Sequence, residues 1–475
     1  MKELLSIRRV FIAVLFIGIL GITARNVVDP DIWWHLKTGE WITQHRAVPR
    51  ADPFSYTRAG QPWIAHEWLS ELMIYGLYRM AGPGGLIVAF AVIHCAAFFL
   101  LYLRCADNRF VSGAITLWGA LATATLWGVR PQMISLLLAS LWLLILERSE
   151  RNQKLLWWTL PILTLWVNLH AGFALGLVIL SLFLLGELFE KMLAPSFSIS
   201  NARLRALSGT LFLNLLLVPL NPNGTKMFWY PLATLRSKAM QSSIDEWASP
   251  NFHRGDQWPF LLLLLATLVT LAWSRTRVRP RDVLLLSISA FAGLSSVRMT
   301  PFFVLVTVPI LSRSLGCGLG RERSSIHQRP AGVTVLNGVL LLAMAGFVSL
   351  HLAQLIQRQP QAEAAHYPVG AVAYLSAHPT AGPVFNHYDW GGYLIFKLYP
   401  ATRVFIDGRA DLYGDHLMAQ RAASYYLRDD WQQPLSEWKI RTVIVPADAA
   451  LATGLHSAPG WMVSYEDSKS VILSR

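Results

Sequence analysis

Long apolar stretches alternate with short polar breaks along the first three quarters of the chain. A membrane-spanning helix needs about 20 apolar residues, or somewhat fewer where neighbouring helices shelter its ends. These stretches run roughly over residues 10–24, 84–103, 112–128, 132–147, 155–168, 173–190, 206–219, 259–273, 283–296, 301–315 and 332–354. We therefore expect an α-helical polytopic membrane protein with about 11 transmembrane helices.

The Lys and Arg residues between these stretches are concentrated in alternate breaks, which is the pattern of cytoplasmic loops. The breaks expected inside hold Arg104, Arg109, Arg148, Arg151, Lys154, Lys191, Arg203, Arg205, Arg275, Arg277, Arg279, Arg281, Arg313, Arg321, Arg323 and Arg329. The opposite short breaks hold only Arg130 and Arg298. We expect a protein of the cytoplasmic (inner) membrane with its N-terminus inside. An odd number of spans then places segments 25–83 and 220–258 and the tail outside.

The tail has a different pattern. Its apolar runs shorten to strand length, as in Pro383 to Phe385, Val404 to Ile406 and Val443 to Val445, and Gly, Pro and Asp separate them. The sequence thus predicts a transmembrane domain over residues 1–356 and a small extracytoplasmic α/β domain over residues 357–475.

Composition agrees with a membrane protein, because 54% of residues are hydrophobic and only 15% are charged. The net charge of +13 could indicate nucleic-acid binding, but the basic residues lie in the breaks between apolar stretches. We therefore attribute this charge to the orientation of the helices in the membrane and expect no nucleic-acid partner. Cys95, Cys105 and Cys317 form no CxxC or Cys/His cluster, which argues against a disulfide framework or a zinc site.

Two carboxylates follow the first apolar stretch directly, in Asp29-Pro30-Asp31, and two Trp and His35 come next. Carboxylates at a membrane boundary suit a general base or the ligands of Mg²⁺ or Mn²⁺. Alternatively, both Asp residues cap the following helix and the Trp pair belongs to the aromatic belt at the membrane surface. Spacing alone does not separate these interpretations.

The same outer segment continues with an amphipathic stretch from Trp63 to Glu71 that carries His66 and Glu67. It could lie along the membrane surface with both side chains facing a cavity, or pack as a juxtamembrane helix with solvated polar groups.

Short outer turns carry Arg130, His170 and Arg298, each at the mouth of a helix pair. Arg holds phosphate through two parallel hydrogen bonds, and a lipid phosphate lies near this depth. An isolated Arg at a helix end also snorkels or pairs with a carbonyl group. The convergence of these turns on one membrane face favours a binding role.

In the tail, Asp389 precedes a Gly pair, and Asp407, Arg409 and Asp411 follow a short apolar run. Paired Gly residues let the backbone approach a ligand or turn tightly, and polar groups at a strand end often form a site. The alternative is a structural Asp/Arg pair that holds a strand-to-helix turn.

Taken together, the first helix, the long outer loop with Asp29-Pro30-Asp31 near its start and the outer tail resemble the glycosyltransferase C (GT-C) superfamily. This resemblance implies that the chain is a bacterial membrane glycosyltransferase that uses a sugar linked to polyprenyl phosphate. The tail's Tyr388-Asp389-Trp390-Gly391-Gly392-Tyr393 looks like a distant variant of the Trp-Trp-Asp-Tyr-Gly signature of oligosaccharyltransferase catalytic subunits. It lacks the double Trp, so recognition of an acceptor sequon is not carried over.

The resemblance implies an enzyme that transfers a sugar, with inversion, from a lipid-phosphate-linked donor to a glycan, lipid or protein acceptor. Asp31 would be the general base or a metal ligand, assisted by Asp29, and Arg130 and Arg298 would stabilise the departing phosphate. The remaining candidates would bind substrate; they are His35, His66, Glu67, His170, Asp389, Asp407, Arg409 and Asp411. A divalent cation is compatible with this site, but the sequence does not require one.

Two other classes of protein fit the same sequence. A carrier of lipid or polysaccharide would need ionisable residues deep within several helices, and the apolar stretches are nearly free of them. An envelope-assembly scaffold would use the tail to dock a partner protein.

Overall fold

The computed structural model describes residues 6–105, 108–193, 199–237, 240–241, 244–273, 278–319, 331–380 and 382–475. The chain folds into two compact units. The first unit contains Met1–Arg25, Ile87–Gly224 and Asp245–Leu355, and the second contains Asn26–Leu86, Thr225–Ile244 and Ile356–Arg475. Helices α3 (Trp68–Tyr102) and α14 (Ala331–His366) contribute to both units.

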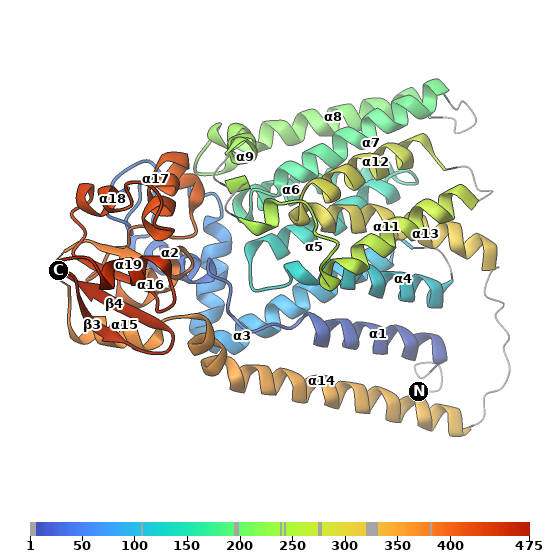
Figure 1. The fold of residues 1–475 in the computed structure, drawn as a ribbon. Helices are drawn as coiled ribbons and strands as arrows, with labels where there is room; N and C mark the ends of the chain where they lie inside the picture. Colours follow the sequence, from blue (N-terminus) through green and yellow to red (C-terminus); the bar gives the residue numbers. More distant parts are fainter. Residues whose placement is uncertain are drawn as a thin grey trace. The chain divides into compact units, whose positions relative to one another are not determined.

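The first unit is helical. Besides its parts of α3 and α14, it contains α1 (Ile7–Thr23), α4 (Arg109–Ala122), α5 (Pro131–Arg148), α6 (Thr159–Leu169), α7 (Phe173–Leu193), α8 (Asn201–Leu217), α11 (Trp258–Trp273), α12 (Pro280–Ser295) and α13 (Thr300–Leu319). Within this unit α7 packs between α8 and α12 (Figure 1). Each predicted apolar stretch overlaps one of these helices. Because α13 continues to Leu319, Cys317 lies within this helix, beyond the predicted apolar stretch 301–315; its side chain is outside the described part.

The starts of these helices follow from local sequence. Ser6, Asn108 and Ser200 precede α1, α4 and α8, and each side-chain oxygen accepts a backbone N–H of the first turn. Pro131 and Pro280 occupy the first position of α5 and α12, where proline needs no N–H partner.

Six helical segments are long and apolar enough to cross a membrane, judged over the described residues by length and composition: Trp68–Tyr102, Pro131–Arg148, Phe173–Leu193, Asn201–Leu220, Gly255–Trp273 and Gly332–His366. Large apolar side chains such as Phe291 (74% exposed) and Leu342 (76% exposed) lie on helix surfaces. Contiguous apolar surface of this kind is costly in water and suits lipid. The chain is a multi-pass membrane protein, while the count of 11 spans and their orientation stay predictions.

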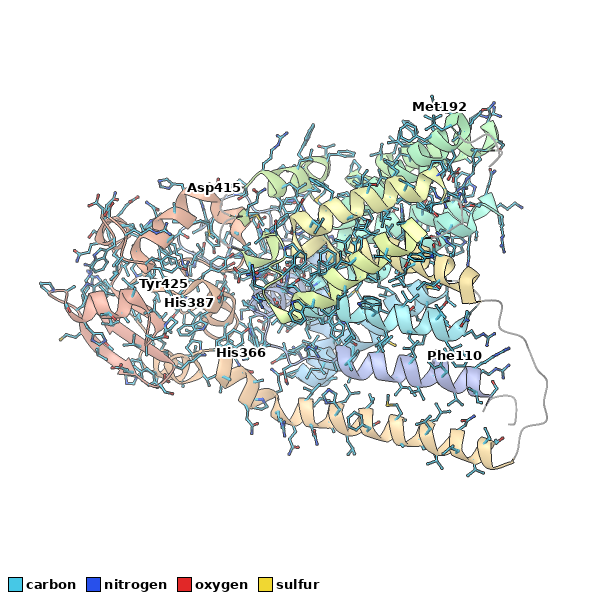
Figure 2. All side chains as sticks on the ribbon, turned by 45° about the vertical axis from the view of Figure 1, so that its right-hand side comes forward. Phe110, Met192, His366, His387, Asp415 and Tyr425 are labelled. Carbon is cyan, nitrogen blue, oxygen red and sulfur yellow. The ribbon has the colours of Figure 1, made fainter. Side chains whose placement is uncertain are left out.

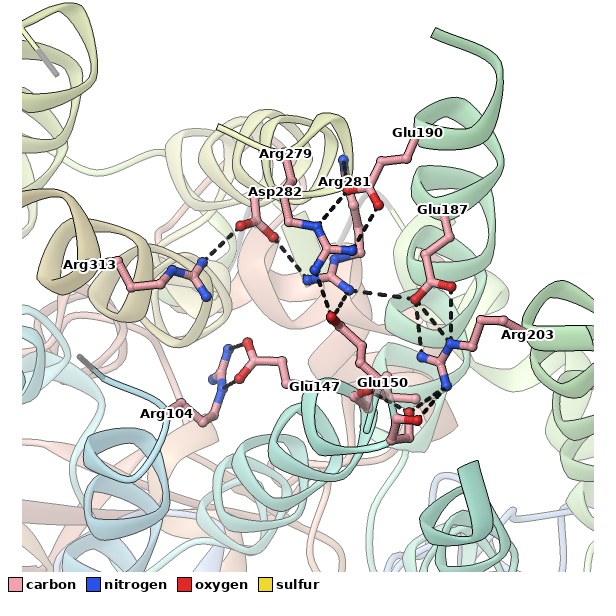
Figure 3. A network of polar contacts seen from close by, with 12 residues as sticks. Arg104, Glu147, Glu150, Glu187, Glu190, Arg203, Arg279, Arg281, Asp282 and Arg313 are labelled. Atoms are coloured by element: carbon pink, nitrogen blue, oxygen red, sulfur yellow. Dashed lines mark hydrogen bonds and ion pairs between the residues drawn. The ribbon is translucent and has the colours of Figure 1, made fainter. Parts of the chain in front are cut away.

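Basic residues that we expect on the cytoplasmic side gather in one ion-pair network within the first unit (Figure 3). Arg203 pairs with Glu187 at 3.1 Å, Arg279 pairs with Glu190 at 2.8 Å, and Arg281 pairs with Glu150. Arg313 and Asp282, and nearby Arg104 and Glu147, form further pairs of 2.8 Å. Glu187 and Glu190 are fully buried, so these charges require their partners. Of the other basic residues, Arg275, Arg277, Arg321, Arg323 and Arg329 lie outside the described residues.

The second unit contains α2 (Ile32–His45), α9 (Lys226–Arg236), α15 (Val369–Ala377), α16 (Gly391–Leu398), α17 (Ala410–Tyr425), α18 (Gln432–Glu437) and α19 (Ala450–His456). Its sheet consists of β1 (Val384–Asn386), β2 (Thr442–Pro446), β3 (Met462–Glu466) and β4 (Ser470–Ser474), in the order β1-β2-β4-β3. The β1–β2 pair is parallel and the other pairs are antiparallel. The sheet packs with α17 and α19 around buried residues such as Phe385, Val443, Leu451 and Leu473.

Two of the three predicted strands correspond to β1 and β2. The third, Val404 to Ile406, is an extended segment in which Val404 forms isolated bridges with Val384 and Ser55. The backbone N–H groups of Phe405 and Ile406 donate to the side chain of Asn386, at 2.9 and 3.3 Å. A side chain therefore replaces the ladder that would have made this segment a strand. Because Ser55 takes part, the outer loop packs together with the tail inside one unit.

Candidate functional site

Asp29 and Asp31 form a turn that leads into α2. The backbone N–H of Asp31 donates to Asp29 Oδ1 at 3.0 Å, which fixes the turn. Asp31 occupies the cap position of α2, but its side chain makes no capping hydrogen bond. Instead, the indole N–H of Trp34 donates to Asp31 Oδ1 at 3.1 Å. The helix-cap interpretation therefore does not describe the Asp31 carboxylate.

The Trp pair after this turn is buried within the second unit and not placed on a lipid-facing surface. Trp33 is 1% exposed and packs edge-on against Tyr367 and Tyr393, with ring centroids 5.4 and 5.1 Å apart. Trp34 is 7% exposed and lies over the ring of His35. Burial of both rings gives the Asp31 turn a rigid base.

Two glycines bring the tail against this turn, and a third brings two segments of the tail together. A Cβ on Gly408 would overlap Asp31 Oδ1, and a Cβ on Gly392 would lie 2.6 Å from the carbonyl oxygen of Pro30. A Cβ on Gly391 would overlap the carbonyl oxygen of Ile406. Separate sequence motifs around residues 29–35, 388–393 and 405–411 thus meet within the second unit. Only glycine permits these approaches.

Asp407 and Arg409 flank Gly408 in the sequence and belong to a buried cluster. The Arg409 guanidinium donates to both oxygens of Asp407, at 2.8 and 2.7 Å, and to Asp52 Oδ1 at 2.8 Å. Its guanidinium also lies 4.6 Å from the ring of Trp63. Burial would lower the pKa of Arg409, but the charges of Asp407, Tyr413 and Asp52 raise it well above its usual value. These contacts favour the structural alternative, in which the pair ties the outer loop to the tail.

His35, His66 and Glu67 form a second polar cluster beside the Asp31 turn. His35 lies between two carboxylates, with Nε2 3.5 Å from Glu67 and Nδ1 3.4 Å from Glu71. His66 Nε2 lies 2.8 Å from the other oxygen of Glu67. Burial would lower the pKa of His66, but the charge and hydrogen bond of Glu67, with a smaller contribution from Asp411, raise it. The expected amphipathic helix begins at Trp68, so His66 and Glu67 precede it.

Tyr230 of α9 connects this cluster to Asp411. Its ring centroid lies 4.3 Å from that of His66, and its hydroxyl donates to Asp411 Oδ2 at 3.0 Å. The outer segment from residue 225 therefore takes part in the polar surroundings of His66.

Asp389 is more than half exposed, and His387 Nε2 lies 3.5 Å from it. His387 also contacts Tyr425 (both labelled in Figure 2), with ring centroids 5.2 Å apart. Burial would raise the pKa of Asp389, but His387 and then Arg421 lower it below its usual value. This carboxylate is ionised at neutral pH.

Tyr388 is the functional candidate that sequence reasoning missed. Its hydroxyl donates to the carbonyl oxygen of Gly408 at 3.3 Å. Burial raises its pKa well above the usual value, and the charges of Asp31, Asp407, Asp389 and Asp411 raise it further. Four of the predicted carboxylates thus act on one tyrosine, which stays a neutral donor. Its position immediately before the candidate Asp389 is the feature of the sequence that could have identified Tyr388.

In the first unit, Arg130 and Arg298 approach one segment. Arg130, at the start of α5, pairs with Glu246. The guanidinium of Arg298 lies 5.2 Å from the ring of Trp247. Because their partners are consecutive residues, both arginines lie on the same side of this unit. His170, at the end of α6, contacts Ser135 of α5 at 2.7 Å.

The predicted site residues are thus divided between the units. Asp29, Asp31 and the other acidic candidates belong to the second unit, whereas Arg130, His170 and Arg298 belong to the first. A single pocket containing Asp31, Arg130 and Arg298 stays a prediction. Among the described residues no three His, Cys, Asp or Glu side chains are placed to hold a metal ion, so a cation would rely on Asp29, Asp31 and non-protein oxygens.

A scan against models of known protein families finds no match, and neither does a search of curated proteins. Solved structures do match. AglB from Archaeoglobus fulgidus, in complex with an inhibitory peptide and a dolichol-phosphate, has a TM-score of 0.59 and 10% identity over 97% of this chain and 73% of AglB. ArnT from Cupriavidus metallidurans, bound to undecaprenyl phosphate, has a TM-score of 0.51 and 13% identity over 98% of this chain and 97% of ArnT.

The arabinofuranosyltransferase AftD from Mycobacteria has a TM-score of 0.55 and 14% identity over 99% of this chain, which spans 40% of the length of AftD. These three proteins are GT-C glycosyltransferases. The chain has the GT-C fold, as its sequence predicted.

Proposed function

We propose that the protein transfers a sugar, with inversion, from a lipid-phosphate-linked donor to a glycan, lipid or protein acceptor. The fold supports this proposal, and the matching AglB and ArnT structures hold dolichol-phosphate and undecaprenyl phosphate. The observation that carries it is the placement of Asp31, whose carboxylate is held by Trp34 and pressed against Gly408.

Asp31 acts as the general base in this proposal. The acceptor hydroxyl attacks the anomeric carbon, its proton passes to Asp31, and the bond from that carbon to the phosphate oxygen breaks. A base must lie within about 3 Å of that proton, and such transfer contributes roughly 10²- to 10⁴-fold. Asp29 assists by holding the turn.

Arg130 and Arg298 stabilise the negative charge that develops on the departing lipid phosphate. Preorganised positive charge is effective there because it needs no rearrangement during the reaction. Both side chains already lie beside residues 246–247, which brings two guanidinium groups to one region of the first unit.

The remaining candidates bind and orient substrate. His35, His66 and Glu67 surround the donor sugar, His170 contacts the phosphate, and Asp389 and Asp411 face the acceptor beside Tyr388. Asp407 and Arg409 act indirectly, because their buried pair fixes Gly408 and with it Asp31.

A divalent cation, Mg²⁺ or Mn²⁺, bound between Asp29, Asp31 and the donor phosphate is part of the proposal as an optional component. It would supply charge neutralisation at the phosphate. Loss of transfer in EDTA and its recovery on adding either ion supports the cation, and full transfer in EDTA removes it.

Transfer takes place at the outer face of the cytoplasmic membrane, with the N-terminus inside and the tail outside. Cysteine replacements at Ser6 and Ser474, probed with a membrane-impermeant maleimide in intact cells, check this orientation. We expect labelling at position 474 alone, and the reverse pattern would invert the topology.

The central experiment compares Asp31→Asn with Asp29→Asn and with Asp429→Asn, an exposed carboxylate far from the motifs in the sequence. Sugar incorporation from labelled polyprenyl-phosphate donors is measured in membranes with matched protein levels. We expect Asp31→Asn to lose roughly 10²- to 10⁴-fold, Asp29→Asn to lose less, and Asp429→Asn to match the wild type. Unchanged turnover in a correctly inserted Asp31→Asn protein would rule out this base.

A further inference from the structure

The second unit contains a cavity of about 210 Å³ to which both the outer loop and the tail contribute. The polar side chains in its wall are those of Tyr56, Thr380, Thr402 and Arg403. Among the described residues that line it, Arg403 is the one charged group. The cavity therefore combines three hydroxyl groups with one positive charge.

Two of these hydroxyl groups have already used their hydrogen. The hydroxyl of Tyr56 donates to the carbonyl oxygen of Val384 at 3.3 Å, and that of Thr380 donates to the carbonyl oxygen of Gly382 at 3.4 Å. Burial raises the pKa of Tyr56 well above its usual value, so this hydroxyl stays neutral. Because a hydroxyl has a single hydrogen, both oxygens can only accept further hydrogen bonds. A ligand in this cavity must bring donors of its own.

Thr402 and Arg403 complement these two acceptors. Thr402 is only 7% exposed, and neither its hydroxyl nor the guanidinium of Arg403 makes a hydrogen bond or ion pair with any residue that the structure describes. A buried hydroxyl without a partner is costly, so a ligand that bonds to Thr402 removes that cost. The guanidinium can only donate, and it holds a carboxylate through two parallel hydrogen bonds.

We propose that this cavity binds an acidic sugar unit of a glycan acceptor, with its carboxylate on Arg403 and its ring hydroxyls on Tyr56, Thr380 and Thr402. The assignment to an acceptor rests on the proposed function and deepens it, because it selects a glycan from the three acceptor classes. A sugar acid supplies the hydroxyl donors and the anionic acceptor that the wall requires. An ammonium donor would be repelled by Arg403, and the oxygens of inorganic phosphate mainly accept.

The location of the cavity suits a unit of the acceptor that lies away from the reacting hydroxyl. Gly408, which lies against Asp31, follows Arg403 by five positions, a span of at most about 18 Å of extended backbone. The segment between them is fixed to the outer loop, because Val404 bridges Ser55 and the hydroxyl of Thr57 donates to the carbonyl oxygen of Phe405 at 2.6 Å. A glycan chain can occupy the cavity with one unit and approach Asp31 with another.

The test measures binding of two matched probes to the purified full chain in phosphatidylcholine nanodiscs by ligand-observed NMR. The probes are methyl glucuronoside and methyl glucoside, which differ only in the carboxylate. The variants are Arg403→Gln, Thr402→Val and Thr402→Ser, and Arg428→Gln replaces an exposed arginine that is not part of the cavity wall. Unfolding temperatures and sugar transfer from labelled polyprenyl-phosphate donors are recorded on the same preparations.

We expect the wild type to bind the glucuronoside about tenfold more tightly than the glucoside, because a hydrogen-bonded carboxylate adds to the hydroxyl contacts. Arg403→Gln should remove this preference and leave glucoside binding unchanged. Thr402→Val should weaken both probes about threefold, and Thr402→Ser, which keeps the hydroxyl, should restore them. Arg428→Gln should match the wild type.

Four results overturn the inference. They are equal affinity for both probes in the wild type, an equal loss in Arg403→Gln and Arg428→Gln, competition by inorganic phosphate as strong as that by the glucuronoside, and equally tight binding of a Gly-Glu-Gly peptide. The last two assign the cavity to a free oxyanion or to a protein acceptor. Any of these results in a chain that transfers sugar leaves the proposed function intact. Selective glucuronoside binding by a chain that does not transfer sugar would retain the cavity as a sugar-acid site and refute the proposed function.

Discussion

Asp31 lies against Gly408 and Asp407 immediately precedes this glycine in the chain, and the two carboxylates differ in what surrounds them. Both oxygens of Asp407 accept hydrogen bonds from Arg409, and the residue has no exposed surface. Asp31 is half-buried, and its carboxylate accepts the N–H of Trp34. Arg409 therefore holds Asp407 in a structural ion pair. Two aspartates that look alike in sequence are therefore suited to different tasks.

The largest effect on stability is expected from Arg409→Met. It leaves Asp407 and Asp52 as buried carboxylates without their cation, which costs about 3–5 kcal/mol. Thermal unfolding followed by tryptophan fluorescence measures this loss. Arg254→Met is the control, because its pair with Asp256 is exposed. Similar unfolding temperatures for both variants would contradict a structural role for the Arg409 cluster.

An intermediate effect, on activity, is expected from Gly408→Ala. The added Cβ overlaps Asp31 Oδ1, so the carboxylate must move. A displacement of about 1 Å at a reacting group can reduce the rate about 100-fold. Sugar transfer per folded protein measures this. Gly209→Ala, where a Cβ meets no atom within 4 Å, should retain wild-type activity. Normal transfer by Gly408→Ala would separate this contact from catalysis.

The smallest effect is expected from Glu67→Gln and depends on pH. In the wild type the pKa of His66 is raised above 6.5, so protonation stabilises the fold below pH 6.5, and this contribution is lost as pH rises through the higher folded value. In Glu67→Gln, burial dominates and lowers the pKa, so acidification destabilises the fold.

Between pH 5 and pH 8, the change in the free energy of unfolding of Glu67→Gln should differ from that of the wild type by about 1 kcal/mol. Unfolding temperatures across this range measure it, with Glu437→Gln as an exposed control. Parallel pH profiles for the wild type and Glu67→Gln would show that Glu67 does not control His66.

Much of the helical architecture was predictable because lipid leaves few choices. A backbone that crosses a membrane must satisfy its own hydrogen bonds, so an apolar stretch of sufficient length becomes a helix. The strand predicted for Val404 to Ile406 was wrong, because these residues form only isolated bridges. Their hydrogen-bonding groups are met by Asn386 and by a bridge to Ser55, and the latter is distant in sequence.

The candidate site was predictable as separate motifs but not as an assembly. Asp29, Asp31 and the glycine pair were visible as polar and flexible positions. The contact of Asp31 with Gly408 depends on packing between segments nearly 400 residues apart in sequence, which no local pattern encodes. The contact between Ser135 and His170 was missed for the same reason, because Ser135 lies on a different helix.

The ion-pair network of the first unit constrains the order in which the chain can mature during translation. Glu187 meets Arg203 soon after both leave the ribosome, since only 16 positions separate them. Arg279 follows Glu190 by 89 residues in the sequence, and Arg281 follows Glu150 by 131 residues, so both arginines are synthesised much later. Early helices therefore enter the bilayer carrying acidic groups whose counter-ions are not yet synthesised. Arg279 and Arg281, at the start of α12, are the residues that supply the missing partners of Glu190 and Glu150.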